Sequence, residues 1–270
     1  VDFLAAAGQG AWQMLPVGPP GWGGSPYMST SAFAGNVALL DVHDLVADGV
    51  LSEAAAAALP DQDAVDGAAY DAAAAARRAD ALLDVAAAAI APSDPSLGDF
   101  CATSASWIED FARFQSLYRR HGGQPWTTWA DDCCDEAALH RERVGQMLFE
   151  RQWRALRAFA NARGVALIGD VPIFVAQDSA DVWAYRELFD LDETGRPCAV
   201  AGVPPDYFSP TGQRWGNPLY RWDVLATQHY RWWVERFRAA FDAFDAVRVD
   251  HFRGFESYWR VPADAETAID

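Results

Sequence analysis

The sequence predicts an α/β fold in which parallel strands alternate with helices, as in part of a (β/α)8 TIM barrel. Two apolar stretches, residues 165–174 and 246–250, have the length and composition of buried strands. Each follows a long amphipathic helical pattern, and polar side chains stand at its C-terminal end. This order of elements is typical of a parallel sheet whose strand ends build a site.

The N-terminal part predicts one more strand and a loop with a functional role. Residues 1–8 are predicted to be the end of a helix closed by Gly8, and residues 11–17 a short buried strand. The next stretch, residues 18–36, has too much Gly and Pro for regular structure but carries Trp22, Tyr27 and Phe33. Such a loop at the C-terminal end of a strand more often builds a site than merely connects.

Residues from about 45 to 145 are predicted to be mostly helical. Helices are expected over residues 52–59, 70–90 and 100–121, and a further helix over 135–163 leads back into a strand. We therefore expect three parts in the chain. They are a barrel segment with the site loop (1–48), a mostly helical insertion subdomain (49–145) and a barrel segment with the last strand (146–270).

The last part of the chain combines helices with one long irregular stretch. A short helix is expected near residues 180–188, and an amphipathic helix over 227–244 leads directly into the strand 246–250. Residues 190–223 are predicted to be irregular, and loops of that length are usually functional or disordered. Their aromatic content argues against disorder.

The composition excludes several classes of function. A net charge of −17 and the lack of any run of basic residues argue against a nucleic-acid partner. The four cysteines form no CxxC pair, which favours reduced thiols in a cytoplasmic protein. No metal-ligand cluster or phosphate-cradling glycine motif stands out, so we expect neither a metal nor a nucleotide cofactor. No segment reaches the roughly eighteen apolar residues of a membrane span.

Two charged residues on the last predicted strand indicate the chemistry. The alternation of residues 246–250 places Arg248 and Asp250 on one face and Val247 and Val249 on the other. A neighbouring arginine keeps a carboxylate ionised, and an ionised carboxylate at a strand end is how a barrel enzyme presents a nucleophile. The alternative is that Asp250 only caps a helix or pairs structurally with Arg248.

Three groups of motifs together resemble a known family. They are WQMLP (12–16) with SPY and SAFAGN (25–36), GDVPI (169–173) with DSADVW (178–183), and VPPDYF (203–208) with GQRWGNPLY (212–220). With these motifs the chain resembles the 4-α-glucanotransferases called amylomaltases or disproportionating enzymes, glycoside hydrolase family 77. The resemblance is weakest in the Ala-rich stretch from about 48 to 96. It implies retaining transfer of α-1,4-glucan segments between maltooligosaccharides, amylose or glycogen.

The resemblance assigns roles to individual residues. Asp250 matches the nucleophile that forms a covalent glycosyl-enzyme, and Arg248 matches the arginine that holds it ionised. His251 matches a histidine that contacts the sugar next to the scissile bond, and Tyr27 matches an aromatic residue that stacks on that sugar. Asp170 falls where the family has a carboxylate at the end of the preceding strand. Taken alone, Asp170 could only orient a turn, and His251 could be an ordinary packed histidine.

Aromatic and amide side chains supply the rest of the expected glucan groove. Sugar faces are apolar and their edges polar, so a groove should combine flat rings with hydrogen-bonding groups. The further substrate-binding residues that we expect are Trp215, Tyr207, Phe208, Asn217 and Trp22. Tyr207 and Phe208 stand in the loop that in the family covers the acceptor side, and Trp22 matches a position tied in some members to a secondary glucan site. Trp215 could instead anchor a buried turn.

The resemblance also implies parts that these 270 residues do not contain. In the family the general acid/base is a glutamate after the next barrel strand, which would lie beyond Asp270, and the first barrel strand would precede Val1. We therefore expect about strands two to four of eight, and no catalysis by this chain alone. Two alternatives remain, namely an α-amylase-type hydrolase, disfavoured by the loop 204–220, and a non-catalytic glucan-binding module.

Overall fold

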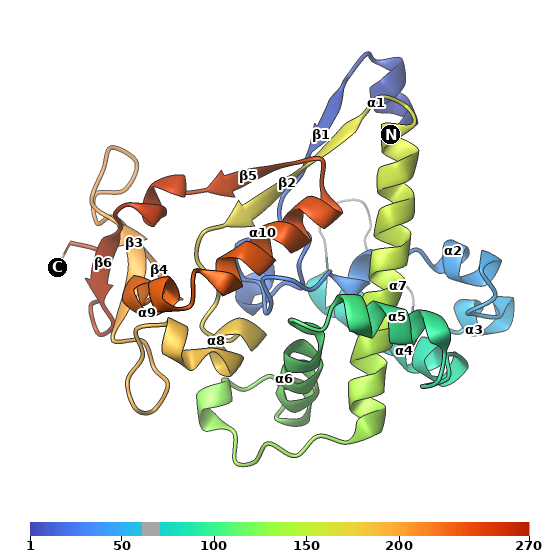
Figure 1. Cartoon of the computed structure of the whole chain (residues 1–270), viewed down its shortest axis with the longest axis horizontal. Helices are drawn as coiled ribbons and strands as arrows, with labels where there is room; N and C mark the ends of the chain where they lie inside the picture. The colour runs from blue at the N-terminus through green and yellow to red at the C-terminus, as the bar shows by residue number, and fades with distance from the viewer. Residues whose placement is uncertain (61–70, 270) are drawn as a thin grey trace.

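The structure is a computed structural model that describes residues 1–60 and 71–269, and it contains a three-stranded parallel sheet (Figure 1). The sheet has the order β1-β2-β5, so β2 lies between the other two strands. Its strands are β1 (Ala11–Gln13), β2 (Ala166–Pro172) and β5 (Ala246–Asp250). Helix α1 (Asp2–Ala6) precedes β1. The α/β class expected from the sequence is confirmed.

Two amphipathic helices lead into the strands and pack against the sheet. They are α7 (Glu136–Asn161), before β2, and α10 (Arg231–Ala243), before β5. The indole Nε1 of Trp153 donates to the carbonyl of Ala243 at 2.9 Å, which joins the two helices. The ring of Phe244 lies directly over Gly169 of β2, where a Cβ atom would come within 2.4 Å of it. The close approach of this ring therefore requires glycine in the strand.

The region between β1 and β2 is mostly helical, and its buried side chains share one hydrophobic cluster with residues that follow β2, such as Phe189 and Trp232. Its helices are α2 (Val42–Ala47), α3 (Glu53–Ala57), α4 (Ala72–Ala89), α5 (Pro95–Thr103) and α6 (Ile108–Arg120). Phe111, Phe114 and Leu117 of α6 are almost fully buried, and α6 packs against α7. The buried ion pair Arg141–Glu142, at 2.7 Å, lies on the side of α7 that faces α4. Among the described residues, no helix combines the length and hydrophobicity needed to cross a membrane.

A second, antiparallel sheet lies on the other side of the molecule from these helices (Figure 1). It has the order β4-β3-β6, with strands β3 (Ala199–Val203), β4 (Gln213–Pro218) and β6 (Trp259–Pro262). Two short helices flank these strands in the sequence, α8 (Ala180–Ala184) before β3 and α9 (Trp222–Thr227) after β4. β6 follows β5 closely in the sequence, so the sheet is tied to the end of the strand that carries Asp250.

Two sequence expectations in the N-terminal half are wrong in detail. The strand expected over residues 11–17 is only three residues long, and all three are exposed. Within the described residues β1 pairs with β2. The single helix expected over 100–121 is two helices. The first helix ends at Thr103, because the backbone of Ser104, with φ −101° and ψ 13°, and that of Trp107, with φ −147°, depart from the helical conformation.

The C-terminal half corrects two further expectations. Residues 190–223 are not irregular, because β3 and β4 form there and pair with each other. Residues 204–212 join the two strands and are called the arm below. β3 also pairs with β6, about sixty residues later in the chain, and local patterns do not report such pairing. The helix expected over 227–244 begins only at Arg231, because His229 and Tyr230 both have φ 53° and separate α9 from α10.

Candidate active site

The ends of β2 and β5 bring three charged side chains together. The register places Asp170 beside Arg248 and Pro172 beside Asp250, so the side chains project from one edge of the sheet. Arg248 Nη1 donates to both carboxylate oxygens of Asp170, at 2.9 and 2.8 Å. Arg248 Nη2 donates to Asp250 Oδ1. One guanidinium therefore holds two carboxylates, in the fork geometry that arginine provides.

The two carboxylates differ in their access to solvent. The side chain of Asp170 is 2% exposed, whereas that of Asp250 is 37% exposed. The negative charges of Asp170 and then Asp250 raise the pKa of Arg248, so this residue stays a cation. Asp250 is thus an accessible carboxylate with a permanent cation beside it, and Asp170 is a buried partner that fixes the cation.

Tyr27 reaches the Asp170 carboxylate from the loop after β1. It lies in the 3-10 turn Pro26–Met28, which begins well because Pro26 presets φ and the Ser25 hydroxyl accepts from the Tyr27 amide. The Tyr27 hydroxyl donates to Asp170 Oδ2 at 2.8 Å. Burial, and then the hydrogen bond to Asp170 with its charge, raise the pKa of Tyr27, so the hydroxyl remains a proton donor.

His251 directly follows Asp250 and has a left-handed backbone, with φ 54°. This conformation is uncommon for a residue other than glycine and points to a constrained position. The turn after it packs tightly, because a Cβ atom at Gly254 would lie 2.8 Å from Ile173 Cδ1. The imidazole stands edge to face with the Trp215 ring, with centroids 5.0 Å apart. Its buried Nε2 makes no hydrogen bond within the described residues.

A cavity of about 380 Å³ opens above these strand ends. Its lining includes Tyr27, Gln213, Trp215, Asn217, Asp250 and His251. Flat rings and hydrogen-bonding groups therefore share one space, and its size is within the range of small-molecule sites. Within the described part of the chain, no cluster of His, Cys, Asp and Glu side chains is suited to a metal ion.

The whole chain matches one known family. The family model described as 4-alpha-glucanotransferase, that of glycoside hydrolase family 77, covers residues 1–270. This chain belongs to that family. The resemblance carried by the sequence motifs is thereby confirmed.

Relatives within the 4-alpha-glucanotransferase family align with nearly all of the chain. The enzyme of Thermus thermophilus is 45% identical over 292 residues, covering 99% of this chain and 56% of its own length. That of Synechocystis sp. is 41% identical, with 99% and 56% covered. The structure of amylomaltase from Streptococcus agalactiae in complex with acarbose is 34% identical, with a TM-score of 0.90. The match covers 100% of this chain and 57% of that one. The chain thus spans about half the length of these relatives.

Trp215 and Asn217 lie on one side of the cavity but differ in what they offer it. Trp215 is half-buried, and its Nε1 donates to Gln213 Oε1 at 3.1 Å, which orients the ring. Asn217 is 5% exposed, and its Nδ2 donates to the Val175 carbonyl at 2.9 Å. The Asn217 amide nitrogen is therefore committed to the backbone, whereas the Trp215 ring is placed against His251.

Tyr207 and Phe208 stand on the arm between β3 and β4 and do not line this cavity. Their exposed fractions are 96% and 88%. The base of the arm is held by Ala268, whose amide donates to the Thr211 carbonyl at 3.1 Å. Trp22 begins the 3-10 turn Trp22–Gly24, and its side chain falls outside the described part of the structure.

Sequence reasoning missed two buried charged residues behind the site. Asp181 on α8 is 3% exposed, and Arg236 on α10 is 4% exposed. A signal was present for Arg236, because it occupies the apolar stripe of α10 that also contains Trp232 and Trp233. An arginine at such a position is buried only if it finds partners. Met28 and Phe174 also line the cavity without having been expected.

Proposed function

We propose that this chain carries the nucleophile side of a retaining 4-α-glucanotransferase, which moves α-1,4-glucan segments between maltooligosaccharides. The observation that carries the proposal is the accessible carboxylate of Asp250, bonded to Arg248 and placed in a cavity of aromatic and polar side chains. Family membership supports it, as does the acarbose bound to the amylomaltase of Streptococcus agalactiae. Amylose and glycogen belong to the same substrate class.

The reaction takes two displacements at the anomeric carbon of the donor. In the first, an oxygen of Asp250 bonds to this carbon, the glycosidic C–O bond breaks, and the leaving 4-oxygen takes a proton from a general acid. In the second, the 4-hydroxyl of an acceptor gives its proton to that same group, and its oxygen replaces Asp250 on the carbon. Each displacement inverts the configuration, so the product retains it.

The neighbouring side chains take supporting roles in this proposal. Arg248 keeps Asp250 ionised for attack, and Asp170 holds Arg248 and Tyr27 in place through the hydrogen bonds described above. We assign the ring of Tyr27 to the donor sugar and the imidazole of His251 to a sugar hydroxyl, since both residues line the cavity that contains Asp250. Trp215 offers a second ring in the same cavity.

Four further residues are also assigned to the substrate. Asn217 has its oxygen left for a sugar hydroxyl, since its nitrogen is bonded to the backbone. Tyr207 and Phe208 are assigned to the acceptor side, where their exposure leaves both rings free to contact a glucan. Trp22 is assigned to a secondary glucan site on the strength of the motif alone.

We further propose that β1, β2 and β5 are about strands two to four of an eight-stranded barrel, with residues 49–145 as an insertion subdomain. The general acid is then a glutamate beyond Asp270. The length of the relatives supports this, since the chain covers about half of each. Glu256 and Glu266 are exposed and do not line the cavity that contains Asp250. On this proposal residues 1–270 bind maltooligosaccharides without transferring them.

Maltotriose incubated with the full-length protein tests the function. Oligosaccharide ladder and total reducing ends are recorded for the full-length protein, its Asp250→Asn variant and residues 1–270 alone. We expect products both longer and shorter than maltotriose, with released glucose and no net gain in reducing ends. The ladder should be absent from the variant and from residues 1–270.

The other possible outcomes distinguish the remaining candidates. A net rise in reducing ends with the full-length protein would identify a hydrolase. No products at all, together with retained glucan binding, would identify a binding module. A full ladder from residues 1–270 would refute the assignment of the general acid to a residue beyond Asp270.

A further inference from the structure

Asp181 is a buried carboxylate that holds the loop carrying Tyr27. It lies in the first turn of α8, and its Oδ2 accepts from the Ala32 amide at 2.8 Å. Its Oδ1 accepts from Trp232 Nε1 at 3.3 Å, which reaches over from α10. The amide of Ala180 also donates to the Thr30 carbonyl at 2.9 Å. Residues 30–32 of the site loop are thus attached to α8 at two points.

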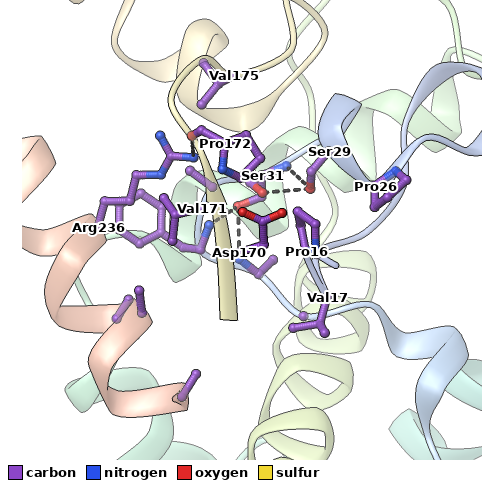
Figure 2. Close-up of a pocket in the computed structure, with 18 of the residues that line it drawn as sticks. Pro16, Val17, Pro26, Ser29, Ser31, Asp170, Val171, Pro172, Val175 and Arg236 are labelled. Carbon is purple, nitrogen blue, oxygen red and sulfur yellow. Dashed lines mark hydrogen bonds between the residues drawn. The ribbon is translucent and has the colours of Figure 1, made fainter. Parts of the chain in front are cut away.

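Arg236 makes the matching contacts to the end of β2. Its Nη2 donates to the Pro172 carbonyl at 2.5 Å and its Nη1 to the Ile173 carbonyl at 3.3 Å. The Tyr220 hydroxyl donates to the same Ile173 carbonyl at 2.9 Å. Figure 2 shows Arg236 reaching from α10 to the strand end beside Asp170. The carbonyls that it binds follow Asp170 by two and three residues.

A gap separates part of the site loop from β2. A cavity of about 120 Å³ lies between the loop, β2 and α10, and both Asp170 and Arg236 line it (Figure 2). Side chains across a void do not fix one another, because dispersion contacts are lost over the gap. Directed hydrogen bonds do fix such segments, and those of Asp181 and Arg236 end on the two walls of this cavity.

Burial of these two charges needs a reason other than stability. Taking an ion out of water costs several kcal/mol, and apolar side chains of the same volume often stabilise a core as well or better. Neither residue belongs to the cavity that contains Asp250. Their hydrogen bonds converge on the loop of Tyr27 and on the strand end after Asp170.

We propose that Asp181 and Arg236 are positioning residues for the glucan transfer proposed above. Asp181 holds the site loop, Arg236 holds the end of β2, and α10 joins them through Trp232. Together they set the distance between the Tyr27 hydroxyl and the Asp170 carboxylate. This inference rests on the proposed function for its catalytic consequence, although the contacts themselves do not.

Asp181→Asn tests the loop side of this network. An ionised carboxylate accepts from both Ala32 and Trp232, whereas an asparagine accepts with its oxygen and must turn its NH2 group toward the other N–H donor. We expect kcat for maltotriose to fall about 10- to 100-fold, the size expected for misplacement of about 1 Å, with KM changed less than about threefold. Arg236→Lys, which keeps the charge but loses the planar fork, should behave alike.

A double-mutant cycle with Tyr27→Phe separates positioning from general loss of folding. If Asp181 and Arg236 act through the Tyr27–Asp170 contact, each double variant should be about as slow as the slower single variant. A merely structural role would make the effects multiply. Glu142→Gln is the matched control, because Glu142 is also a buried carboxylate bonded to an arginine, but within the helical region. Its effect should multiply with that of Tyr27→Phe.

Hydrogen exchange gives a readout that does not depend on activity. Amide exchange in residues 30–36 should quicken in Asp181→Asn and stay unchanged in Glu142→Gln. Unchanged exchange in Asp181→Asn, or multiplying effects in the cycles of both Asp181→Asn and Arg236→Lys, would overturn the inference. A wild-type protein that transfers no glucan would refute the proposed function instead, and the exchange data would still decide whether Asp181 holds the loop.

Discussion

The two sides of the proposed glucan groove differ in the burial and the hydrogen bonding of their side chains. On the side of β2 and β5, Asp170 is 2% exposed and every charged group has a partner within hydrogen-bond distance. On the arm between β3 and β4, Tyr207 and Phe208 are 96% and 88% exposed. A nucleophile has to meet one carbon atom within tenths of an ångström, which favours groups on rigid strands. A surface for acceptors of varied length does not need that precision.

The arm is nevertheless ordered along its backbone. The Asp206 carboxylate accepts from the amides of Phe208 and Ser209, and the Ser209 hydroxyl donates to the Gly212 carbonyl at 2.6 Å. The difference between the two sides therefore lies in the partners of the side chains and not in the order of the chain. Four predictions probe this difference.

The largest effect is expected at Asp250. Asp250→Asn removes the attacking oxygen and should lower kcat/KM for maltotriose by at least about 10⁴-fold, the scale for loss of a catalytic nucleophile. Asp223→Asn is the control, because Asp223 also pairs with an arginine two residues away, Arg221, at 3.2 Å. It should stay within about twofold of the wild type. Equal losses in both variants would end the assignment of Asp250.

Arg248→Lys should produce the second largest effect. An ammonium cannot hold two carboxylates in the planar fork that Arg248 provides, so both Asp170 and Asp250 lose their alignment. Steady-state rates with maltotriose should fall by about 10²- to 10³-fold, as for loss of one preorganised electrostatic contact. Arg221→Lys at the exposed pair is the matched control. A rate near that of the wild type would show that the alignment of Asp170 and Asp250 does not depend on the fork of Arg248.

The hydrogen bonds behind the side of β2 and β5 should also make the free energy of unfolding depend on pH, which we do not expect of the arm. Burial, opposed by the Ala32 amide and by Arg236, raises the pKa of Asp181 to about 6 from an ordinary value of 3.8. The folded protein therefore binds this proton more tightly than the unfolded chain, and stability is lost as pH rises from about 4 through 6. The loss amounts to about 3 kcal/mol, or about 10²-fold in the unfolding equilibrium.

Denaturant unfolding at pH 4 to 7 measures this loss by comparison with Asp181→Asn. The free energy of unfolding of the wild type, relative to that of the variant, should fall across the window. A constant difference between the two proteins would show that Asp181 does not titrate there.

The smallest effect is expected on the arm. On the proposed acceptor side, the ring of Tyr207 would exclude water from the glycosyl-enzyme once a glucan is bound. For Tyr207→Ala we therefore expect hydrolysis to gain on transfer by about two- to fivefold while total turnover changes little. The ratio is measured from reducing ends against disproportionation products. Phe3→Ala, which removes an exposed ring elsewhere, should leave the ratio unchanged. An unchanged ratio in Tyr207→Ala would remove the arm from the reaction.

The parts of the fold that local patterns specify were predicted well. β5 matches residues 246–250, and the alternation that put Arg248 and Asp250 on one face is present in the structure. Helix α7 differs from its expected bounds by a residue or two. β3, β4 and β6 were missed, because β3 stands between β4 and β6 and pairs with β6 across about sixty residues of chain, which no window of sequence reveals.

The residues of the candidate site also fall into those that the sequence indicated and those that only the fold revealed. Motifs brought Tyr27, Asp170 and Asp250 to attention, and the structure places all three around one guanidinium or one cavity. Asp181 and Arg236 escaped notice because a charged residue in a sequence is expected at the surface. Their burial depends on partners from three separate segments, and only the assembled fold shows these.

Arg248 has two counterions, and this uneven ratio matters once a covalent bond forms. In the proposed reaction Asp250 becomes a neutral ester, and its charge disappears from the cluster. A cation with Asp250 as its sole counterion would then stand unneutralised beside an electron-poor anomeric carbon. Because Asp170 keeps both of its oxygens on Arg248, the cluster passes from one net negative charge to none and never becomes positive.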